Sequence, residues 1–555
     1  MEATARTIRG IGIGDGAALG RLHWLAPATA AEASAATAAA PEPRDPREEE
    51  SRFRAAQTRA RDALEALYAE SRAAVGEEAA QIFAVHAMIA DDEDFTDLVL
   101  ARIAAGEGAE LAVVGAADEL AARFRAMEDE YLRARAGDFA DIAARLCDLL
   151  TDGGEAPAPA LPDWDEPIIL AARDLTPSQT VGLDRARVAG FVTGAGSPGS
   201  HTAILARSLS LPALVGAGEF DGPALEGKRV LLDAAAGQLI VEPDPTALAA
   251  YHTRTAARAA ADRARMGLVD LPAQTRSGKR ILLCANIGRP AEAQEAAELG
   301  ADGVGLMRSE FLYLGRPDPP GEAEQYNAYR TAAEALGDRM LVIRTLDIGA
   351  DKQADYLGLP HEENPALGLR AIRLCLAQRA LFRCQLRAIC RAAGERPGQI
   401  AVMFPMICST HEFDEAMGEL RAVQTELRIS GEPTDQSLSV GMMIETPAAA
   451  ILADEFAARC AFFSIGSNDL TQYTLAVDRQ NAAVAGIADG LHPAVLALIE
   501  RTAAAIHATG GWCGLCGEIA ADPALTETLL RAGVDELSVS PSQLLRIKES
   551  VRNTP

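Results

Sequence analysis

Residues 438–469 read LSVGMMIETPAAAILADEFAARCAFFSIGSND, and this stretch decides the fold. Its two apolar runs, at 438–445 and 461–469, have the length and composition of buried strands, and the alanine-rich segment between them is long enough for a helix. Eight such runs occur in order: ILLCANI (281–287), GVGLMRS (303–309), MLVIRTL (340–346), IAVMFPM (400–406), LSVGMMIE (438–445), AFFSIGSND (461–469), WCGLCGE (512–518) and ELSVSP (536–541). This alternation predicts a (β/α)8 barrel, with a doubly wound open sheet as the competing architecture.

Polar and charged residues follow these runs at the points where the predicted strands end. Five ends carry them: Arg308-Ser309-Glu310, Arg344-Thr345-Leu346-Asp347, Glu445-Thr446, Asn468-Asp469 and Cys516-Gly517-Glu518. In a barrel the loops after the strands converge on one face, where the chemistry of this fold takes place. Any single residue fits a salt bridge that caps the barrel equally well, but agreement among five strands favours a functional mouth.

The basic residues near these ends suit a small polyanionic ligand. Arg308, Arg344 and Arg479 have planar guanidinium groups that hold phosphate or carboxylate through paired hydrogen bonds, and Lys352 adds a point charge. The sequence therefore indicates a site for a phosphorylated substrate.

Two carboxylates and a thiol complete this set. Glu445 and Asp469 follow neighbouring predicted strands, and Mg²⁺ is usually held by one or two carboxylates together with substrate oxygens. Cys516 has two interpretations, an inert core thiol or a proton donor at a strand end. With Cys513 it also forms a CxxC pair, which is weak evidence for zinc because no second pair accompanies it.

The N-terminal half has a different organisation. Residues 7–25 mix glycine with short apolar runs, whereas residues 48–150 show the spacing of amphipathic helices, enough for roughly four. A linker rich in proline and glycine follows, and then strand-like runs alternate with short helices. We therefore expect a discontinuous α/β domain at 1–27 and 151–243, an inserted helical domain at 28–150, a linker helix at 244–270 and the barrel at 271–555.

One histidine stands in a distinctive context. His201 follows the loop Gly194-Ala195-Gly196-Ser197-Pro198-Gly199-Ser200 and precedes the helical pattern TAILARSLS, with Ser200 placed as an N-cap. A helix N-terminus disfavours an imidazolium and attracts an anion, so this position suits a neutral nucleophile that becomes phosphorylated. The alternative is purely structural, because glycine loops before helices are common.

Composition and charge narrow the class of protein. The chain has 555 residues, of which 49% are hydrophobic, and its 52 basic and 79 acidic residues give a net charge of −27. The negative electrostatic field of such a charge repels nucleic acid and anionic membranes, and it suits a basic protein partner. Because the sequence has no long apolar run and the stretch MEATARTIRG lacks the apolar core of a signal peptide, we expect a cytoplasmic protein without membrane insertion.

Motifs along the chain carry a family resemblance. GSPGSHTAILARSLSLPALVG, GVGLMRSEFL, VIRTLDIGADK, ENPALGLRAIRL, MFPMI, IETPAAA, FFSIGSNDLTQYTLAVDR and GLCGE occur in this order between about residues 8 and 553. The sequence resembles enzyme I of the phosphoenolpyruvate:sugar phosphotransferase system. This resemblance implies that His201 receives the phosphoryl group of phosphoenolpyruvate and that Thr176 helps to orient it.

The resemblance also implies roles for the residues of the barrel. Phosphoenolpyruvate would be bound by Arg308, Arg344, Lys352, Asn468, Asp469 and Arg479. Glu445 and Asp469 would hold Mg²⁺, and Cys516 would protonate the enolate to give pyruvate. A homodimer formed through the barrel is implied as well.

The helical domain resembles a docking site for the histidine phosphocarrier protein, which would pass the group on and drive sugar uptake. His86, Met88 and Ile89, followed by the acidic run at 91–94, fit an apolar patch with an acidic rim for a basic carrier. The alternative is an ordinary helix with a solvated acidic end. Because His201 would have to meet both the barrel mouth and the carrier, the helix at 244–270 is the expected swivel.

Departures from the family pattern and rival functions are also visible. The family usually has Gly-Gly-x-Thr-Ser-His where this chain has Pro198-Gly199 before Ser200, Ala350 replaces a usual glycine, and Asp15 interrupts a usual Ser-Pro-Gly. A pyruvate-phosphate dikinase or phosphoenolpyruvate synthase would need a nucleotide-binding domain, which the alanine-rich helical region does not resemble. A catalytically silent regulatory relative and a paralogue of a nitrogen or fructose branch are further alternatives.

Overall fold

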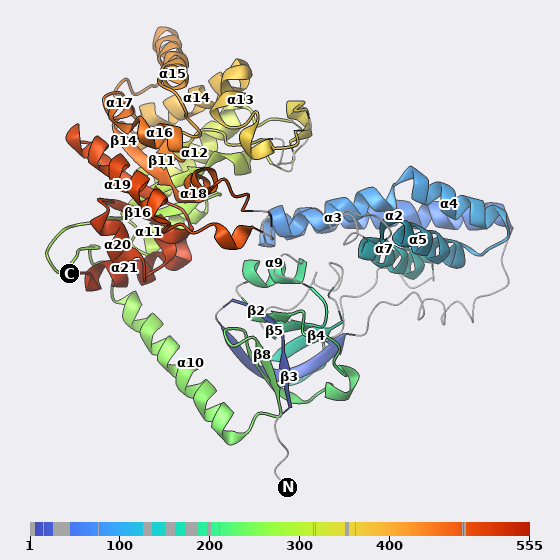
Figure 1. The fold of residues 1–555 in the computed structure, drawn as a ribbon. Helices are drawn as coiled ribbons and strands as arrows, with labels where there is room; N and C mark the ends of the chain where they lie inside the picture. The colour runs from blue at the N-terminus through green and yellow to red at the C-terminus, as the bar shows by residue number, and fades with distance from the viewer. Residues whose placement is uncertain are drawn as a thin grey trace. The chain divides into compact units, whose positions relative to one another are not determined.

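The computed structural model describes residues 6–555 except for residues 15, 26–44, 76, 126–135, 151–160, 174, 176–186, 197–200, 210, 315, 317, 350–353, 361, 480 and 482–483. The chain divides into two compact units, Met1–Ala257 and Arg258–Pro555, which are described separately below (Figure 1).

The second unit is built on a closed barrel of eight parallel strands. They are β9 (Leu282–Ile287), β10 (Gly303–Arg308), β11 (Met340–Arg344), β12 (Ile400–Phe404), β13 (Ser439–Ile444), β14 (Phe462–Gly466), β15 (Trp512–Cys516) and β16 (Glu536–Val539). Each strand pairs with the next one along the chain, and the last pairs with the first. The predicted barrel is therefore confirmed, and the open sheet is excluded as an alternative.

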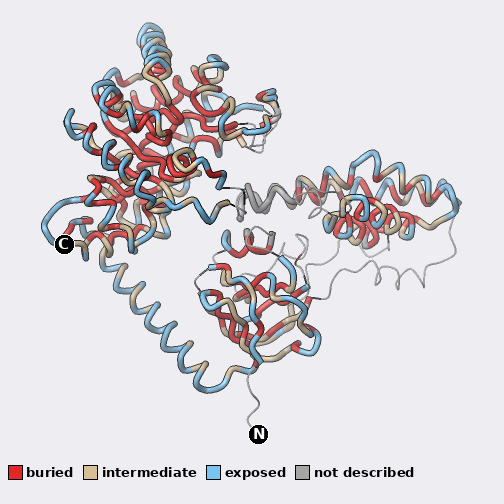
Figure 2. Tube along the Cα trace, viewed as in Figure 1, coloured by how far each residue is buried: buried red, intermediate tan, exposed pale blue. Residues whose placement is uncertain are grey.

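Helices follow the strands. They are α11 (Glu292–Glu298), α12 (Glu322–Leu336), α13 (Ile372–Ala377), α14 (Arg379–Glu395), α15 (Thr410–Ser430), α16 (Pro447–Ile451), α17 (Ala453–Ala457), α18 (Ser467–Leu475), α19 (Pro493–Ala508), α20 (Thr526–Arg531) and α21 (Leu544–Asn553). Short 3-10 turns at Ser309–Leu312 and Glu518–Ala521 directly follow β10 and β15. The strands lie in the buried interior of this unit, and the helices expose their outer faces (Figure 2).

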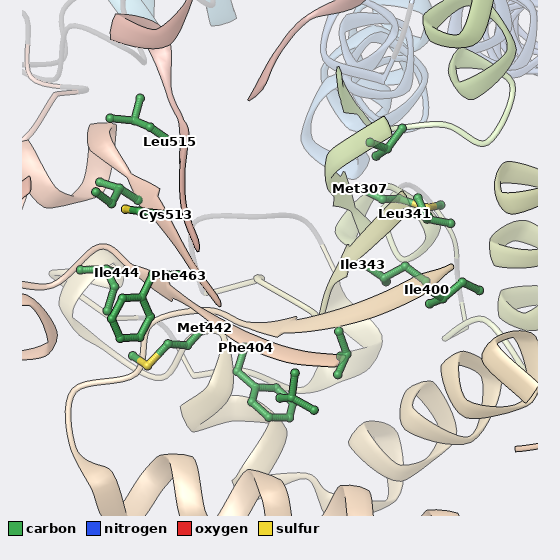
Figure 3. Close-up of a cluster of buried hydrophobic side chains, with 14 of the residues drawn as sticks. Met307, Leu341, Ile343, Ile400, Phe404, Met442, Ile444, Phe463, Cys513 and Leu515 are labelled. Carbon is green, nitrogen blue, oxygen red and sulfur yellow. The ribbon is translucent and has the colours of Figure 1, made fainter. Parts of the chain in front are cut away.

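Apolar side chains pack on both sides of the barrel strands. One cluster lies between strands and helices and includes Met307, Leu341, Ile343, Phe404, Met442, Ile444, Phe463 and Leu515 (Figure 3). A second cluster comes from the alternate positions of the same strands and fills the barrel: Leu306, Val342, Ala401, Met403, Met443, Phe462 and Cys516. Because the interior is packed, a ligand site in this unit has to lie at the mouth.

A single carboxyl group is buried at the start of the last barrel strand. Glu536 begins β16 and has no exposed surface. Burial raises the pKa of Glu536 to about 8, and the nearby Cys284 thiol opposes this shift only in part. The group is therefore mostly neutral near pH 7.

We predict that Glu536→Gln removes a pH dependence from the stability of the barrel. The ordinary pKa of this carboxyl is 4.5, so the folded state holds an extra proton between about pH 4.5 and 8, and stability falls as pH rises through that window. Between pH 6 and 8 the free energy of unfolding of the wild type should fall by about 2 kcal/mol more than that of the glutamine variant. Urea denaturation followed by circular dichroism at both pH values measures this difference, and equal losses would contradict the prediction.

The first unit contains an eight-stranded sheet. Its strands are β1 (Arg6–Arg9), β2 (Ile11–Ile13), β3 (Ala17–Leu25), β4 (Ile168–Ala172), β5 (Val188–Thr193), β6 (Ala213–Val215), β7 (Arg229–Asp233) and β8 (Gln238–Val241), in the order β1-β8-β7-β3-β4-β5-β6-β2. β3 and β4 pair in parallel, from Arg21 with Ile168 to Leu25 with Ala172, although a helical segment separates them in sequence. The N-terminal residues thus supply three strands to this sheet.

The helical segment between β3 and β4 has a core of its own. Its described helices are α2 (Pro46–Val75), α3 (Glu77–Ala90), α4 (Glu93–Ala104), α5 (Ala109–Arg125) and α7 (Ala136–Leu150). These are five helices where the sequence suggested roughly four. Asp92 separates two of them: its side chain accepts a hydrogen bond from the Phe95 N–H and starts α4 two residues after α3 ends.

Two further helices are described: one in the first unit, and one that spans the boundary between the two units. α9 (His201–Ser208) begins at the nominated histidine, after β5. α10 (Pro245–Met266) lies within residues 244–270, where the sequence predicts a linker helix, and has no buried residue. Throughout the described ranges no helix combines the length and the apolar character that spanning a bilayer requires.

Candidate active site

The carboxyl ends of the barrel strands gather a buried network of arginines and carboxylates. Arg344, the last residue of β11, donates to Glu310 Oε1 at 2.6 Å, and its Nη1 lies 3.0 Å from Asp347 Oδ2. Arg370 Nη2 donates to Asp347 Oδ1 at 2.9 Å, and its Nη1 lies 3.8 Å from Asp469 Oδ1. Each of the five residues is at most 8% exposed. These ion pairs join the segments that follow β10, β11 and β14.

The sequence patterns assign no role to three members of this network. Glu310 and Asp347 stand at predicted strand ends, whereas Arg370 lies in the ENPALGLRAIRL motif just before α13. The one sequence feature that could have indicated Arg370 is its place two residues after Gly368, in a loop between predicted elements. Its partners, however, are distant in sequence, and only the closed barrel brings them into contact.

Glu445 is the most enclosed carboxylate of the mouth. It follows β13 with no exposed surface, its Oε1 accepts a hydrogen bond from the Met406 N–H at 2.6 Å, and its Oε2 has no hydrogen-bond partner among the described residues. Gly466 leaves room for it, since a Cβ there would lie 2.8 Å from Oε2. Burial raises the pKa of Glu445 above its ordinary value, and the Asp469 carboxylate adds to the shift.

A divalent cation fits this arrangement of carboxyl oxygens. Oδ1 of Asp469 also accepts no hydrogen bond within the described residues, and the nearest guanidinium nitrogens, of Arg370 and Arg479, lie 3.8 and 3.9 Å away. A cation would relieve the repulsion between Asp469 and Glu445. Among the described side chains no group of three or more His, Cys, Asp and Glu is arranged to hold a metal. The protein would thus supply only part of the ligand shell, as is usual for Mg²⁺.

Cys516 lies beside these groups as the last residue of β15. It is buried, its strand neighbour in β14 is Gly466, and its Sγ accepts a hydrogen bond from Ser464 Oγ at 3.4 Å. Burial raises the pKa of the thiol to about 11, although the Ser464 hydrogen bond and Arg344 lower it in part. The thiol therefore carries its proton at neutral pH, as a general acid must.

The remaining nominated barrel residues lie at the rim of the mouth. Asn468 Nδ2 donates to Glu518 Oε1 at 3.3 Å, and Asn468 Oδ1 accepts from the Glu518 N–H at 3.1 Å. Arg308 ends β10 with an exposed side chain, and the exposed Arg479 lies near Asp469. The nominated barrel residues that are described all stand at the carboxyl ends of strands or in the segments that follow them, with Asn468 and Asp469 in the first turn of α18.

Some nominated positions lie outside the described residues. These are Lys352, Thr176, Ala350 and the Pro198-Gly199 pair. The backbone of His201 is described as the first residue of α9, but its side chain is not. The roles given to these residues stay predictions.

In the helical segment His86 does not reach the surface. It is fully buried, with Nε2 3.4 Å from Asp138 Oδ1 and Nδ1 3.3 Å from Asp141 Oδ2, both on α7. Met88 is 73% exposed and Ile89 is half-buried. The prediction that His86 contributes to an exposed docking patch is therefore wrong, because its ring is used to join α3 to α7.

This buried histidine makes the stability of the helical segment pH-dependent. Although burial opposes its charge, Asp138 and Asp141 raise the pKa of His86 from 6.5 to about 8. Stabilisation by the charged ring is fully present below pH 6.5 and is lost as pH rises through 8. The free energy of unfolding falls by about 2 kcal/mol over this range. We predict that His86→Gln lacks this step. Urea titrations of both proteins at pH 6 and 9 test the point, and an undiminished step in the variant would refute it.

Comparison with known proteins gives a consistent result along the chain. Residues 9–135 match the N-terminal domain of PEP-utilising enzymes, residues 164–237 their mobile domain and residues 263–555 their PEP-binding domain. The phosphoenolpyruvate-protein phosphotransferase of Bacillus sp. (strain S) is 40% identical over 549 residues, which cover 99% of this chain and 93% of that protein. The protein of the same name from Haemophilus influenzae is 41% identical over 512 residues, covering 91% and 87% of the two chains. This chain therefore belongs to the phosphoenolpyruvate-protein phosphotransferase family of PEP-utilising enzymes.

Proposed function

We propose that this chain is a phosphoenolpyruvate-protein phosphotransferase that transfers the phosphoryl group of phosphoenolpyruvate to His201 and then to a histidine phosphocarrier protein. The observation that carries the proposal is the buried network at the barrel mouth. There Arg344 and Arg370 pair with Glu310 and Asp347. Beside them Glu445 Oε2 and Asp469 Oδ1 accept no hydrogen bond from the described residues. An intact network of this kind argues against a catalytically silent relative.

Substrate binding rests on the arginines of this network. Nε of Arg344 has no hydrogen-bond partner among the described residues, so it is available to the phosphate or carboxylate of the substrate. Arg308, Arg479 and Asn468 would bind the remaining oxygens from the rim, and Lys352 would contribute a further positive charge. The carboxylates on Arg344 hold its guanidinium group in place before the substrate arrives, which limits reorganisation during the reaction.

Glu445 and Asp469 would hold Mg²⁺. When bound, this ion neutralises charge on the phosphoryl oxygens and orients the substrate. Oε2 of Glu445 and Oδ1 of Asp469, which accept no hydrogen bond from the described residues, support these ligand assignments.

Two proton-carrying side chains would complete the reaction. A neutral imidazole nitrogen of His201 attacks phosphorus, the new N–P bond forms as the bond to the enol oxygen breaks, and the electron pair stays on the enolate. The enolate then takes the Cys516 thiol proton at its methylene carbon, which gives pyruvate and a thiolate that solvent reprotonates. Thr176 would orient the imidazole of His201.

The helical segment would receive the carrier. The exposed Met88, the half-buried Ile89 and the acidic residues at 91–94 supply an apolar surface with a negative rim, which suits a basic partner. We further propose a cytoplasmic homodimer joined through the barrel, which sedimentation at micromolar concentration tests; a monomer would count against it.

A pyruvate burst tests the proposed function. When the full chain is mixed with phosphoenolpyruvate and Mg²⁺, we expect one pyruvate released per chain, after which release stops until a phosphocarrier is added. His201→Ala should release none. Steady release without a carrier, or an equal burst from the variant, would reject the function.

A further inference from the structure

A strained peptide unit lies against the carboxylate of Glu445. Met406, in the loop after β12, has φ of 55°, in the left-handed region that residues other than glycine rarely adopt. For a residue with a Cβ this conformation costs on the order of 1 kcal/mol or more. The N–H of this same residue donates to Glu445 Oε1 at 2.6 Å.

Neighbouring contacts fix this loop on both sides. Thr446 Oγ1 donates to the Ile407 carbonyl at 3.0 Å, which joins the loop after β12 to the loop after β13. Beyond it, Ser409 and Glu412 form a capping box that starts α15. Costly backbone conformations held by surrounding contacts cluster at functional sites.

Related strain occurs elsewhere around the mouth. The described non-glycine residues with positive φ are Glu242, Ala371, Met406 and Ala476. Ala371 directly follows Arg370, and Ala476 caps the C-terminus of α18, which begins at the mouth. Of these four, Met406 donates its N–H to a carboxylate, that of Glu445.

We propose that the left-handed peptide at Met406 positions the metal-binding oxygen of Glu445. By holding Oε1, the Met406 N–H fixes the rotation of the carboxylate and leaves Oε2, which has no hydrogen-bond partner in the described residues, to face the cation. The inference rests on the proposed function, in which Glu445 is a metal ligand. The feature required is the backbone conformation of residue 406, and the chemistry of its side chain is secondary.

Variants at Met406 separate backbone from side chain. Met406→Leu keeps the volume and the same cost at positive φ, whereas Met406→Ile keeps the volume but is β-branched and strongly disfavours positive φ. Met406→Gly adopts positive φ freely but removes a side chain that is only 2% exposed, so it should lower the melting temperature.

Binding of Mn²⁺ alone, measured by electron paramagnetic resonance on the full chain, tests the proposal. We expect Met406→Ile to weaken Mn²⁺ binding by at least about tenfold, and Met406→Leu and Met406→Gly to stay within about threefold of the wild type. In steady-state assays Met406→Ile should raise the metal concentration needed for activity and leave the KM for phosphoenolpyruvate unchanged.

The possible outcomes distinguish a failure of this inference from a failure of the proposed function on which it rests. Wild-type Mn²⁺ binding that Glu445→Gln leaves intact would remove Glu445 from the metal site and overturn the inference with it. Binding that depends on Glu445 but is unchanged in Met406→Ile overturns the inference alone. If affinity falls in the order of thermal stability, with Met406→Gly the weakest binder, the role of Met406 is packing and the inference is again overturned.

Discussion

Replacing Arg344 by methionine is expected to abolish phosphorylation by phosphoenolpyruvate and to destabilise the barrel. The side chain is 6% exposed and lies against Glu310 and Asp347, so its loss leaves two buried carboxylates without their central partner. Breaking a buried pair in this way costs about 3–5 kcal/mol. Loss of a charged donor to the phosphoryl group should lower kcat/KM by about 10³-fold in the protein that remains folded.

The matched variant Arg344→Lys separates these two effects. Lysine keeps the positive charge beside Glu310 and Asp347 but lacks the planar fork, so we expect most of the stability to return while kcat/KM stays low. Single-turnover rates and urea midpoints measure the two quantities. Full recovery of activity with lysine would show that positive charge alone suffices. Paired hydrogen bonds from the Arg344 guanidinium group to the substrate would then not be needed.

Replacing Glu445 by glutamine is expected to lower activity by about 10³-fold without unfolding the protein. The amide oxygen can still accept the Met406 N–H bond, and the amide fills the space beside Gly466 that the carboxylate occupies. What is lost is the carboxylate oxygen that would bind the cation, because an amide replaces it. We therefore expect normal thermal stability, weakened Mn²⁺ binding and a very slow pyruvate burst.

Glu536→Gln is the matched control for this experiment. Glu536 is an equally buried glutamate of the same barrel, but it stands at the start of β16, whereas Glu445 follows the end of β13. Its amide variant should retain metal binding and the full burst. Comparable losses in the two variants would mean that any amide in the barrel interior is harmful and that Glu445 has no special role.

The sequence predicts the barrel mouth well for a physical reason. Parallel strands that are buried on both faces are apolar along their length, so the polar residues that follow them mark the strand ends. Glu445, Asp469 and Cys516 were nominated in this way, because each ends an apolar run or follows shortly after one. Closure of the barrel then places all such ends on one face.

Features that depend on long-range contacts were not predictable from the same patterns. Arg370 has no apolar run before it, and its pairing with Asp347 exists only after the barrel closes. His86 lies next to the exposed Met88, so local sequence does not reveal that the ring is buried against α7. The positive φ of Met406 was likewise not predictable, because residue 406 is not a glycine and its loop is held by a capping box and by Thr446.

Locating the phosphoryl group is the most direct test of the central claim. The full chain is incubated with phosphoenolpyruvate labelled in its phosphoryl group and with Mg²⁺, digested at neutral to alkaline pH, and analysed by mass spectrometry. We predict an acid-labile phosphoryl group on the peptide that contains His201, and no label in His201→Ala. Label on any other residue, or equal label in the variant, would contradict the account.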